Sequence, residues 1–259
     1  MVASQGGIFG LNSDWTAVQV TNGSGRGPVL LICEHASDFI PQDFDLGLSP
    51  AAQASHAAWD IGALDVAVAL SGMLDAPLVA GGISRLVYDC NRPLTAPDCI
   101  PARSEVFDIP GNANLSDQEK QSRFDRVHTP FHDAVDELRR QAAPQLVVTI
   151  HSFTPIYNGT KRDVELGFLF HSDPTTAQAL LTQEQLNGTY RAALNEPYAA
   201  TDGVTYSLQK HGEAHGIDAV MIEIRNDLID TGDTAHAMAQ HLNEVLRAAF
   251  PTLFQEASE

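Results

Sequence analysis

The sequence is poor in cysteine, in positive charge and in long apolar runs, and each shortage excludes a class of protein. Its three cysteines are an odd number without paired spacing, which argues against a disulfide framework. Lys and Arg number 15 against 33 Asp and Glu, and the formal charge of −18 disfavours nucleic acid and anionic membranes as partners. No apolar run approaches the roughly 20 residues that a membrane-spanning helix needs.

Several common catalytic and targeting signatures are missing as well. The stretch Met1–Gly7 lacks the basic and apolar regions of a signal peptide, so we expect a reducing, cytoplasmic location. No Gly-x-Ser-x-Gly elbow is present, which disfavours a serine hydrolase. The glycines of residues 23–27 and 81–82 match neither of the common phosphate-binding patterns.

What is present is the composition of an ordinary globular protein. The 259 residues are 44% hydrophobic and 19% charged, far from the composition of disordered chains. The chain contains no internal repeat and no convincing linker. We therefore expect one domain over residues 1–259, in which the polar, glycine-rich residues 1–26 form an N-terminal arm.

Apolar runs of strand length alternate with segments of helical periodicity along the chain. This alternation predicts an α/β fold of stacked layers around a mixed, largely parallel sheet. The expected strands are residues 28–33, 77–80, 86–88, 145–150, 166–170 and 219–222, and the expected helices are residues 50–54, 61–74, 174–195, 234–249 and a long one that begins at Ser116.

Three of the expected strands end abruptly in imidazole or carboxylate. One apolar run stops just before His35, a second runs into His151 and a third runs into Glu223. Ligands of open α/β sheets bind beyond the carboxyl ends of the strands. The three strand ends therefore predict one shared site.

The two histidines at strand ends point to a metal site. Catalytic zinc is commonly held by two His and one carboxylate, and it keeps a fourth position for water. His35 and His151 supply the imidazoles, and Asp38, Glu34 and Asp60 are the candidates for the carboxylate. Asp38 shares a face with His35 if the loop enters a helical turn. A histidine that merely caps its strand is the competing interpretation.

Glu223 and the nearby arginines and histidines are further candidates. Beside a metal, Glu223 would act as general base, whereas an ion pair with Arg225 is the alternative interpretation. Arg85 and Arg92 flank a short expected strand, where a guanidinium can bind a carboxylate or polarise a carbonyl. Surface charge is the alternative for each. The remaining histidines of interest are expected to be structural or substrate-lining, namely His56, His128, His132, His211 and His215.

With these residues assembled, the chain resembles the N-formylglutamate amidohydrolase family. More remotely, the same landmarks are similar to those of zinc carboxypeptidases, which implies a three-layer, zinc-carboxypeptidase-like (phosphorylase/hydrolase-like) fold. The resemblance covers most of the chain and lies in the stretches Cys33–Ser37, His56–Ala63, Ser84–Pro93, Pro130–His132, Thr149–Phe153 and Ile222–Leu228.

The resemblance implies a role for each matching residue. His35 and His151 become zinc ligands, Glu223 becomes the general base and Arg85 a polariser of the scissile carbonyl. The Asn91–Arg92 pair becomes a clamp for the substrate carboxylate, and Arg225 and Ser152 join the substrate-binding residues. The carboxypeptidase glutamate ligand falls on Asp38, one methylene shorter, so Glu34 and Asp60 stay open as the third ligand.

The activity that the resemblance implies is hydrolysis of an N-acyl amino acid, a small-molecule substrate. Zn²⁺ or another divalent transition metal would be the cofactor, and N-formyl-L-glutamate, cleaved to formate and L-glutamate in histidine degradation, is the first candidate substrate. A metallocarboxypeptidase or another N-acyl-amino-acid amidase is the alternative within this class. A metal-free binding protein for amino-acid-like ligands is the alternative outside it.

Overall fold

The computed structural model describes residues 15–255. The first part of the expected N-terminal arm, residues 1–14, lies outside this range. None of the helices within the described range is both long and apolar enough to cross a membrane. The strands are β1 Val18–Thr21, β2 Val29–Cys33, β3 Leu78–Gly81, β4 Arg103–Ser104, β5 Phe107–Asp108, β6 Leu146–Phe153, β7 Ile156–Tyr157, β8 Thr160–Lys161, β9 Leu166–Leu169, β10 Ala192–Leu194 and β11 Asp218–Arg225, and the helices are α1 Pro50–Gln53, α2 Ala63–Leu74, α3 Asp117–Arg123, α4 Thr129–Ala142, α5 Thr175–Asn187 and α6 Gly232–Ala249.

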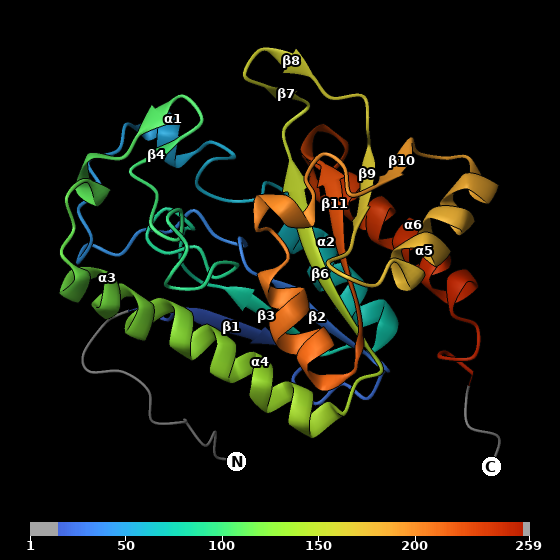
Figure 1. Cartoon of the computed structure of the whole chain (residues 1–259). Helices are drawn as coiled ribbons and strands as arrows, with labels where there is room; N and C mark the ends of the chain where they lie inside the picture. Colours follow the sequence, from blue (N-terminus) through green and yellow to red (C-terminus); the bar gives the residue numbers. More distant parts are fainter. Residues whose placement is uncertain (1–14, 256–259) are drawn as a thin grey trace.

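A seven-stranded mixed sheet runs through the centre of the fold, in the order β1-β3-β2-β6-β11-β9-β10 (Figure 1). The four strands β3, β2, β6 and β11 are parallel to one another, whereas β1 pairs antiparallel with β3 and β9 pairs antiparallel with β11. This confirms the predicted α/β fold with a mixed, largely parallel sheet. The carboxyl ends of β2, β6 and β11 consequently lie along one edge of the sheet.

Helices cover both faces of the sheet, which gives three layers (Figure 1). In β2, Val29 and Leu31 pack in the cluster that contains α2, α5 and α6, whereas Leu30 and Ile32 pack in the cluster that contains α4. Every residue of β2 and of β6 is buried. Strands covered on both faces read as continuous apolar runs, and this is why these two strands are recognisable in the sequence.

Two expected elements are wrong in detail. Residues 86–88 belong to no strand, because residues 85–87 form a turn and residue 88 is irregular, and their buried side chains pack in the α4 cluster. The helix expected over residues 174–195 ends at Asn187, where Gly188 adopts a left-handed conformation with φ +66°, and residues 192–194 form β10. In the first case burial of an apolar triplet imitated a strand, and in the second a glycine C-cap ended the helix early.

Gly62 allows the tight turn between Asp60 and the start of α2. Gly62 lies two residues after Asp60 at the N-cap of α2 with φ +79°, and a Cβ on it would approach the carbonyl oxygen of Ile229 to 2.2 Å. We expect Gly62→Ala to lower the free energy of unfolding by at least about 1 kcal/mol, because the left-handed conformation is costly for a residue with a Cβ. Denaturant unfolding measures this change.

The matched control is Gly72→Ala in the same helix. A Cβ on Gly72 would meet no atom within 4 Å, and Gly72 is exposed inside α2. This substitution is expected to raise the free energy of unfolding by up to about 1 kcal/mol, because alanine is the better helix former. Equal effects of the two substitutions would contradict the role given to Gly62.

Candidate metal centre and active site

Two neighbouring strands bring a histidine and a glutamate side by side. β6 and β11 are parallel, and their register pairs His151 with Glu223. β2 lies on the other side of β6 and ends at Cys33, two residues before His35. All three side chains are buried, and they line one cavity. The structure thus brings together the three strand ends that the sequence predicted to share a site.

Asp60 reaches this site from the loop before α2, and the fold holds it there. Its backbone N–H donates to the carbonyl oxygen of His35 at 2.9 Å. The backbone N–H of Ser152 donates to Asp60 Oδ2 at 3.3 Å, and the Ser152 hydroxyl donates to the carbonyl oxygen of Ile61 at 2.8 Å. The loop is therefore attached to both strand ends at which the histidines lie.

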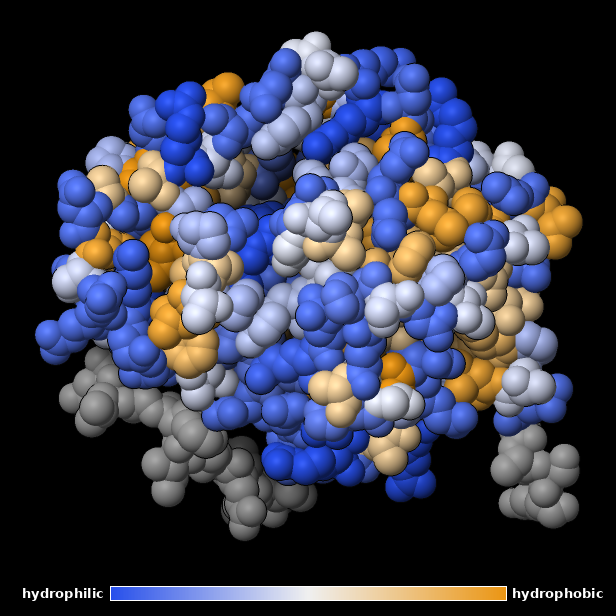
Figure 2. Space-filling view, viewed as in Figure 1, coloured by the Kyte–Doolittle hydropathy of each residue, from blue (hydrophilic) through white to orange (hydrophobic). Residues whose placement is uncertain are grey.

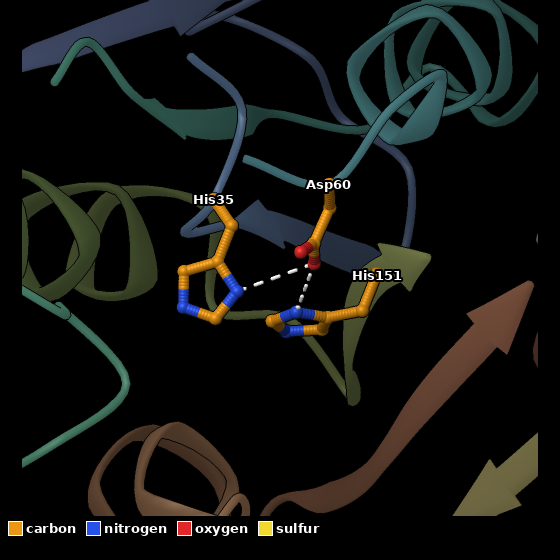
Figure 3. Close-up of side chains that lie close together, drawn as sticks. All are labelled: His35, Asp60 and His151. Atoms are coloured by element: carbon orange, nitrogen blue, oxygen red, sulfur yellow. Dashed lines mark hydrogen bonds and ion pairs between the residues drawn. The ribbon is translucent and has the colours of Figure 1, made fainter. Parts of the chain in front are cut away.

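Asp60 lies between the two imidazoles. Its Oδ2 atom is 3.2 Å from His35 Nδ1 and 2.9 Å from His151 Nδ1 (Figure 3). Tetrahedral zinc, with ligand atoms at about 2.0–2.1 Å, separates neighbouring ligand atoms by about 3.3 Å. Both distances from Asp60 are close to that spacing, and these three residues form a group that could hold a metal ion.

The far side of each imidazole faces a further carboxylate. His35 Nε2 is 2.8 Å from Asp89 Oδ1, and His151 Nε2 is 3.1 Å from Glu34 Oε2. The hydrogen bond to Asp89 requires a proton on Nε2, which in a neutral imidazole leaves the lone pair on Nδ1, the atom that faces Asp60. Carboxylates behind metal-ligating histidines orient the rings in the same way. The positions of Asp89 and Glu34 are thus compatible with a metal ion bound at the Nδ1 atoms of the two histidines.

The charge of the cluster also calls for a cation. The carboxylates of Glu34, Asp60 and Asp89 are buried, and among the described residues Arg85 is the one arginine paired with the cluster, through Asp60 at 3.4 Å and Asp89 at 2.9 Å. With both imidazoles neutral, as metal ligation requires, the three carboxylates and the one guanidinium carry a net charge of −2, which one divalent cation would balance. Burial lowers the pKa of His151, but Glu34 and Asp60 outweigh burial and raise it well above its usual range.

The carboxylate that lies between the two imidazoles is that of Asp60, whereas Asp38, the first choice from the sequence, does not belong to this group. Asp38 is exposed, and the chain after His35 continues as an irregular loop and not as a helical turn. His35 and Asp38 therefore do not share a face. Asp60 was one of the alternatives that the sequence left open, and Glu34, the other, lies behind His151.

Glu223 has the properties of a proton acceptor. Burial and the nearby Asp60 raise its pKa to about 7, although His151 and His35 act in the opposite direction. Its Oε2 atom is buried and has no hydrogen-bond partner among the described residues, and the side chain lines the cavity, so the protein leaves this oxygen unpaired. Arg225, the partner of Glu223 in the alternative interpretation, instead donates to Asp227 and Glu165.

A cavity of about 520 Å³ opens over the cluster, large enough for an acylated amino acid. Figure 2 shows a hollow lined mainly by hydrophilic residues below the β7–β8 hairpin. Its walls include Arg85, whose side chain is 29% exposed, and Tyr198, in which burial and Glu223 raise the pKa of the phenol to about 12. Ser104 and Glu105, from the long loop that the sequence places over residues 94–115, also line it.

The residues expected to clamp a substrate carboxylate are occupied by protein contacts. Arg92 pairs with Asp98 at 2.9 Å and donates to the carbonyl oxygens of residues 91, 202 and 203. The Asn91 side chain bonds the backbone of Val204 and Ser207. Both residues line the cavity and hold its 202–207 wall in place. Arg225 lies outside the cavity lining, and the Ser152 hydroxyl is committed to Ile61.

Three residues of the site escaped the sequence analysis. Asp89 lies in a stretch that carries the family resemblance, but it pairs with Arg85 across a turn, where no helical spacing marks the two residues as partners. Tyr198 and Arg162 lie in loops without a recognisable local pattern. Their place in the cavity depends on how these loops pack.

Three other histidines form a separate stack. His132 lies between His128 and His211, with ring centroids 4.1 Å and 4.9 Å away, and its Nδ1 is 2.6 Å from His211 Nε2. All three are buried, and His132 Nε2 donates to the carbonyl oxygen of Cys90. The stack thus ties α4 to the 208–212 segment and to the loop that carries Asn91.

The stack makes stability depend on pH. Burial, with Lys210 and His211, lowers the pKa of His128 to about 3, against an ordinary 6.5. Below pH 6.5 the unfolded chain therefore binds a proton that the folded protein does not, so stability falls as pH falls towards 3. The loss from this group approaches about 1.4 kcal/mol per pH unit. In urea unfolding, the free energy of unfolding of His128→Phe should fall less steeply with falling pH than that of the wild type. An equally steep fall in both proteins would contradict this prediction.

Known proteins resemble both the sequence and the fold. The profile of the family described as N-formylglutamate amidohydrolase matches residues 27–230. A solved structure of the gene product Atu2144 from Agrobacterium tumefaciens is 45% identical, with a TM-score of 0.89 over 93% of this chain and 97% of that chain. An N-formylglutamate amidohydrolase from Ralstonia eutropha JMP134 is 18% identical, with a TM-score of 0.64 over 90% of this chain and 97% of that chain. No curated protein matches the sequence.

Proposed function

Because the chain belongs to the N-formylglutamate amidohydrolase family, we propose that it is a zinc-dependent amidohydrolase that cleaves the amide bond of an N-acyl amino acid. The first candidate substrate is N-formyl-L-glutamate, cleaved to formate and L-glutamate. The observation that carries the proposal is the position of Asp60 between two imidazole Nδ1 atoms, each ring backed by a further carboxylate. Burial of such a cluster of carboxylates carries a large desolvation penalty unless a cation compensates the charge.

His35, Asp60 and His151 would hold the metal, and the site chemistry fits a borderline-soft divalent ion such as zinc. When bound, such a metal supplies Lewis acidity to the cleavage of the amide. Glu34 and Asp89 orient the two histidines from behind. Ser152, which lines the cavity, supports the site by fixing the loop that carries Asp60.

Glu223 moves the proton in the proposed mechanism. Its carboxylate takes a proton from the water that attacks the acyl carbon, and it returns the proton to the leaving amine nitrogen as the carbon–nitrogen bond breaks. A pKa of about 7 suits a group that must both accept and donate near neutral pH. The products are a carboxylic acid and a free amino acid.

Arg85 stabilises the negative charge that develops on the acyl oxygen. Two of its five N–H groups donate to Asp60 and Asp89, which fix the guanidinium at the cavity wall. The remaining N–H groups are available to an oxyanion in the cavity. Asn91 and Arg92 contribute by holding the 202–207 wall in place.

Metal analysis combined with a substrate panel tests the proposal. The purified protein should contain one zinc per chain, and it should hydrolyse N-formyl-L-glutamate in preference to N-acetyl amino acids and peptides. Chelation should abolish turnover, and zinc should restore it. Preference for peptides would favour the carboxypeptidase alternative, and a protein without transition metal and without turnover would favour the binding-protein alternative.

A further inference from the structure

Arg162 lies at the cavity wall on the C-terminal side of the β7–β8 hairpin, held among three aromatic rings. Its guanidinium carbon is 4.5 Å from the ring centroid of Tyr157, 4.9 Å from that of Tyr198 and 5.6 Å from that of Phe153. Nη1 donates to the Tyr198 hydroxyl at 3.2 Å and to the carbonyl oxygen of Thr154 at 3.3 Å. The fork of the side chain is thus fixed before any ligand arrives.

The charge of Arg162 is uncompensated. Within residues 15–255, no carboxylate lies within 4.0 Å of its guanidinium, and its Nε and Nη2 have no acceptor. The other two arginines of the cavity differ in this respect, because Arg85 pairs with Asp60 and Asp89, and Arg92 pairs with Asp98. A half-buried guanidinium with three free N–H groups is a receptor for an anion.

Arg92, the expected carboxylate clamp, has little left to offer a ligand. Its Nε donates to Asp98, Nη1 donates to two carbonyl oxygens and Nη2 donates to a third. Four of its five N–H groups are therefore used. An incoming carboxylate would have to break these bonds, whereas Arg162 can accept it without loss.

Contacts at the rim of the cavity hold the β7–β8 hairpin in place beside Arg162. The backbone N–H of Asn158, at the tip of the hairpin, donates to Glu105 Oε1 at 3.2 Å, and Glu105 Oε2 lies 2.7 Å from His56 Nε2. The two loops above the cavity are thus joined through Glu105. Because the hairpin is braced in this way, binding at Arg162 costs little ordering of the chain.

We propose that Arg162 is the specificity-determining residue that binds a carboxylate of the amino acid whose amide is cleaved. The proposal rests on the proposed function for the identity of the ligand. It assigns the carboxylate to a residue outside the Asn91–Arg92 pair. The rings of Tyr157, Tyr198 and Phe153 position the guanidinium, and its Nε and Nη2 groups bind the two carboxylate oxygens.

The test measures binding without turnover. The full-length, zinc-loaded protein is titrated by calorimetry with L-glutamate and with its monoamides L-glutamine and L-isoglutamine, each of which replaces one carboxylate. In the wild type, one of the amides should bind about 10- to 100-fold more weakly than L-glutamate, because it loses a charge-assisted bidentate contact. The amide that binds more weakly shows which carboxylate Arg162 receives.

In Arg162→Gln, L-glutamate should bind as weakly as that amide binds to the wild type, and the amide should show no further loss. Arg162→Lys, which retains the charge without the fork, should retain part of the difference. A variant that only distorts the rim would weaken acid and amide by the same factor. Such an equal loss would overturn the proposal. So would unchanged binding of L-glutamate in Arg162→Gln, or failure of the wild type to bind L-glutamate.

Arg103→Gln is the matched control. Arg103 is exposed on β4, near the same rim, and pairs with Asp108. This variant should keep the wild-type difference between acid and amide. Because no step of the test requires hydrolysis, a protein that binds L-glutamate through Arg162 and cleaves no N-acyl amino acid would overturn the proposed function, and only the assignment of Arg162 as the residue that binds the carboxylate would remain.

Discussion

Glu223→Gln is expected to lower kcat for hydrolysis of the N-acyl amino acid by about 1,000-fold, while the metal content stays at the wild-type level. The amide has nearly the shape of the carboxylate, but it cannot take a proton from water, and general acid–base catalysis contributes about 10²- to 10⁴-fold. Glu223 is not one of the three proposed metal ligands, so its substitution should leave the metal in place. Steady-state kinetics together with metal analysis of the same preparation measures both quantities.

The control for this substitution is Glu137→Gln, at an exposed position on α4, where the side chain accepts hydrogen bonds from Arg140 and Gln141. It should leave kcat and metal content unchanged. If Glu223→Gln retained most of the wild-type kcat, another group would have to move the proton. Loss of metal together with loss of turnover would instead mean that Glu223 holds the metal centre together.

Asp60→Asn is expected to lower zinc affinity by at least about 100-fold and to abolish turnover at stoichiometric zinc. Changes to residues that merely support a metal ligand already cost about 10- to 100-fold in affinity or activity. The substitution removes a negatively charged oxygen that lies 2.9 Å and 3.2 Å from the two imidazole nitrogens. Competition with a zinc-binding dye measures the affinity.

Asp38→Asn is the matched control, because Asp38 was the carboxylate first expected from the sequence and the structure leaves it exposed. This variant should bind zinc as the wild type does. The opposite result, in which Asp38→Asn loses zinc and Asp60→Asn keeps it, would require the loop after His35 to fold over the site. Loss of zinc in neither variant would remove both residues from the ligand set.

Some features of the protein were determined by the sequence alone. The strand that ends two residues before His35 and the strands that carry His151 and Glu223 are recognisable because their apolar runs are buried on both faces and give way to polar residues towards their carboxyl ends. The helix starts at Ser49 and Ser116 are equally local, since each side chain accepts a hydrogen bond from the backbone of its own first turn. The position of the site at the sheet edge follows from the parallel strands.

Other features were decided only by the tertiary structure. Asp60 lies between the two imidazoles because its backbone N–H donates to the carbonyl oxygen of His35 and because the backbone N–H of Ser152 donates to its side chain. These hydrogen bonds join segments that are far apart in the chain. Arg92 and Arg162 are both arginines of loops, but one is surrounded by acceptors and the other by aromatic rings. Local patterns describe how a segment hydrogen-bonds to itself. Which loops meet over the sheet edge depends on strand register and on the packing of distant side chains, and no single stretch of the sequence contains that information.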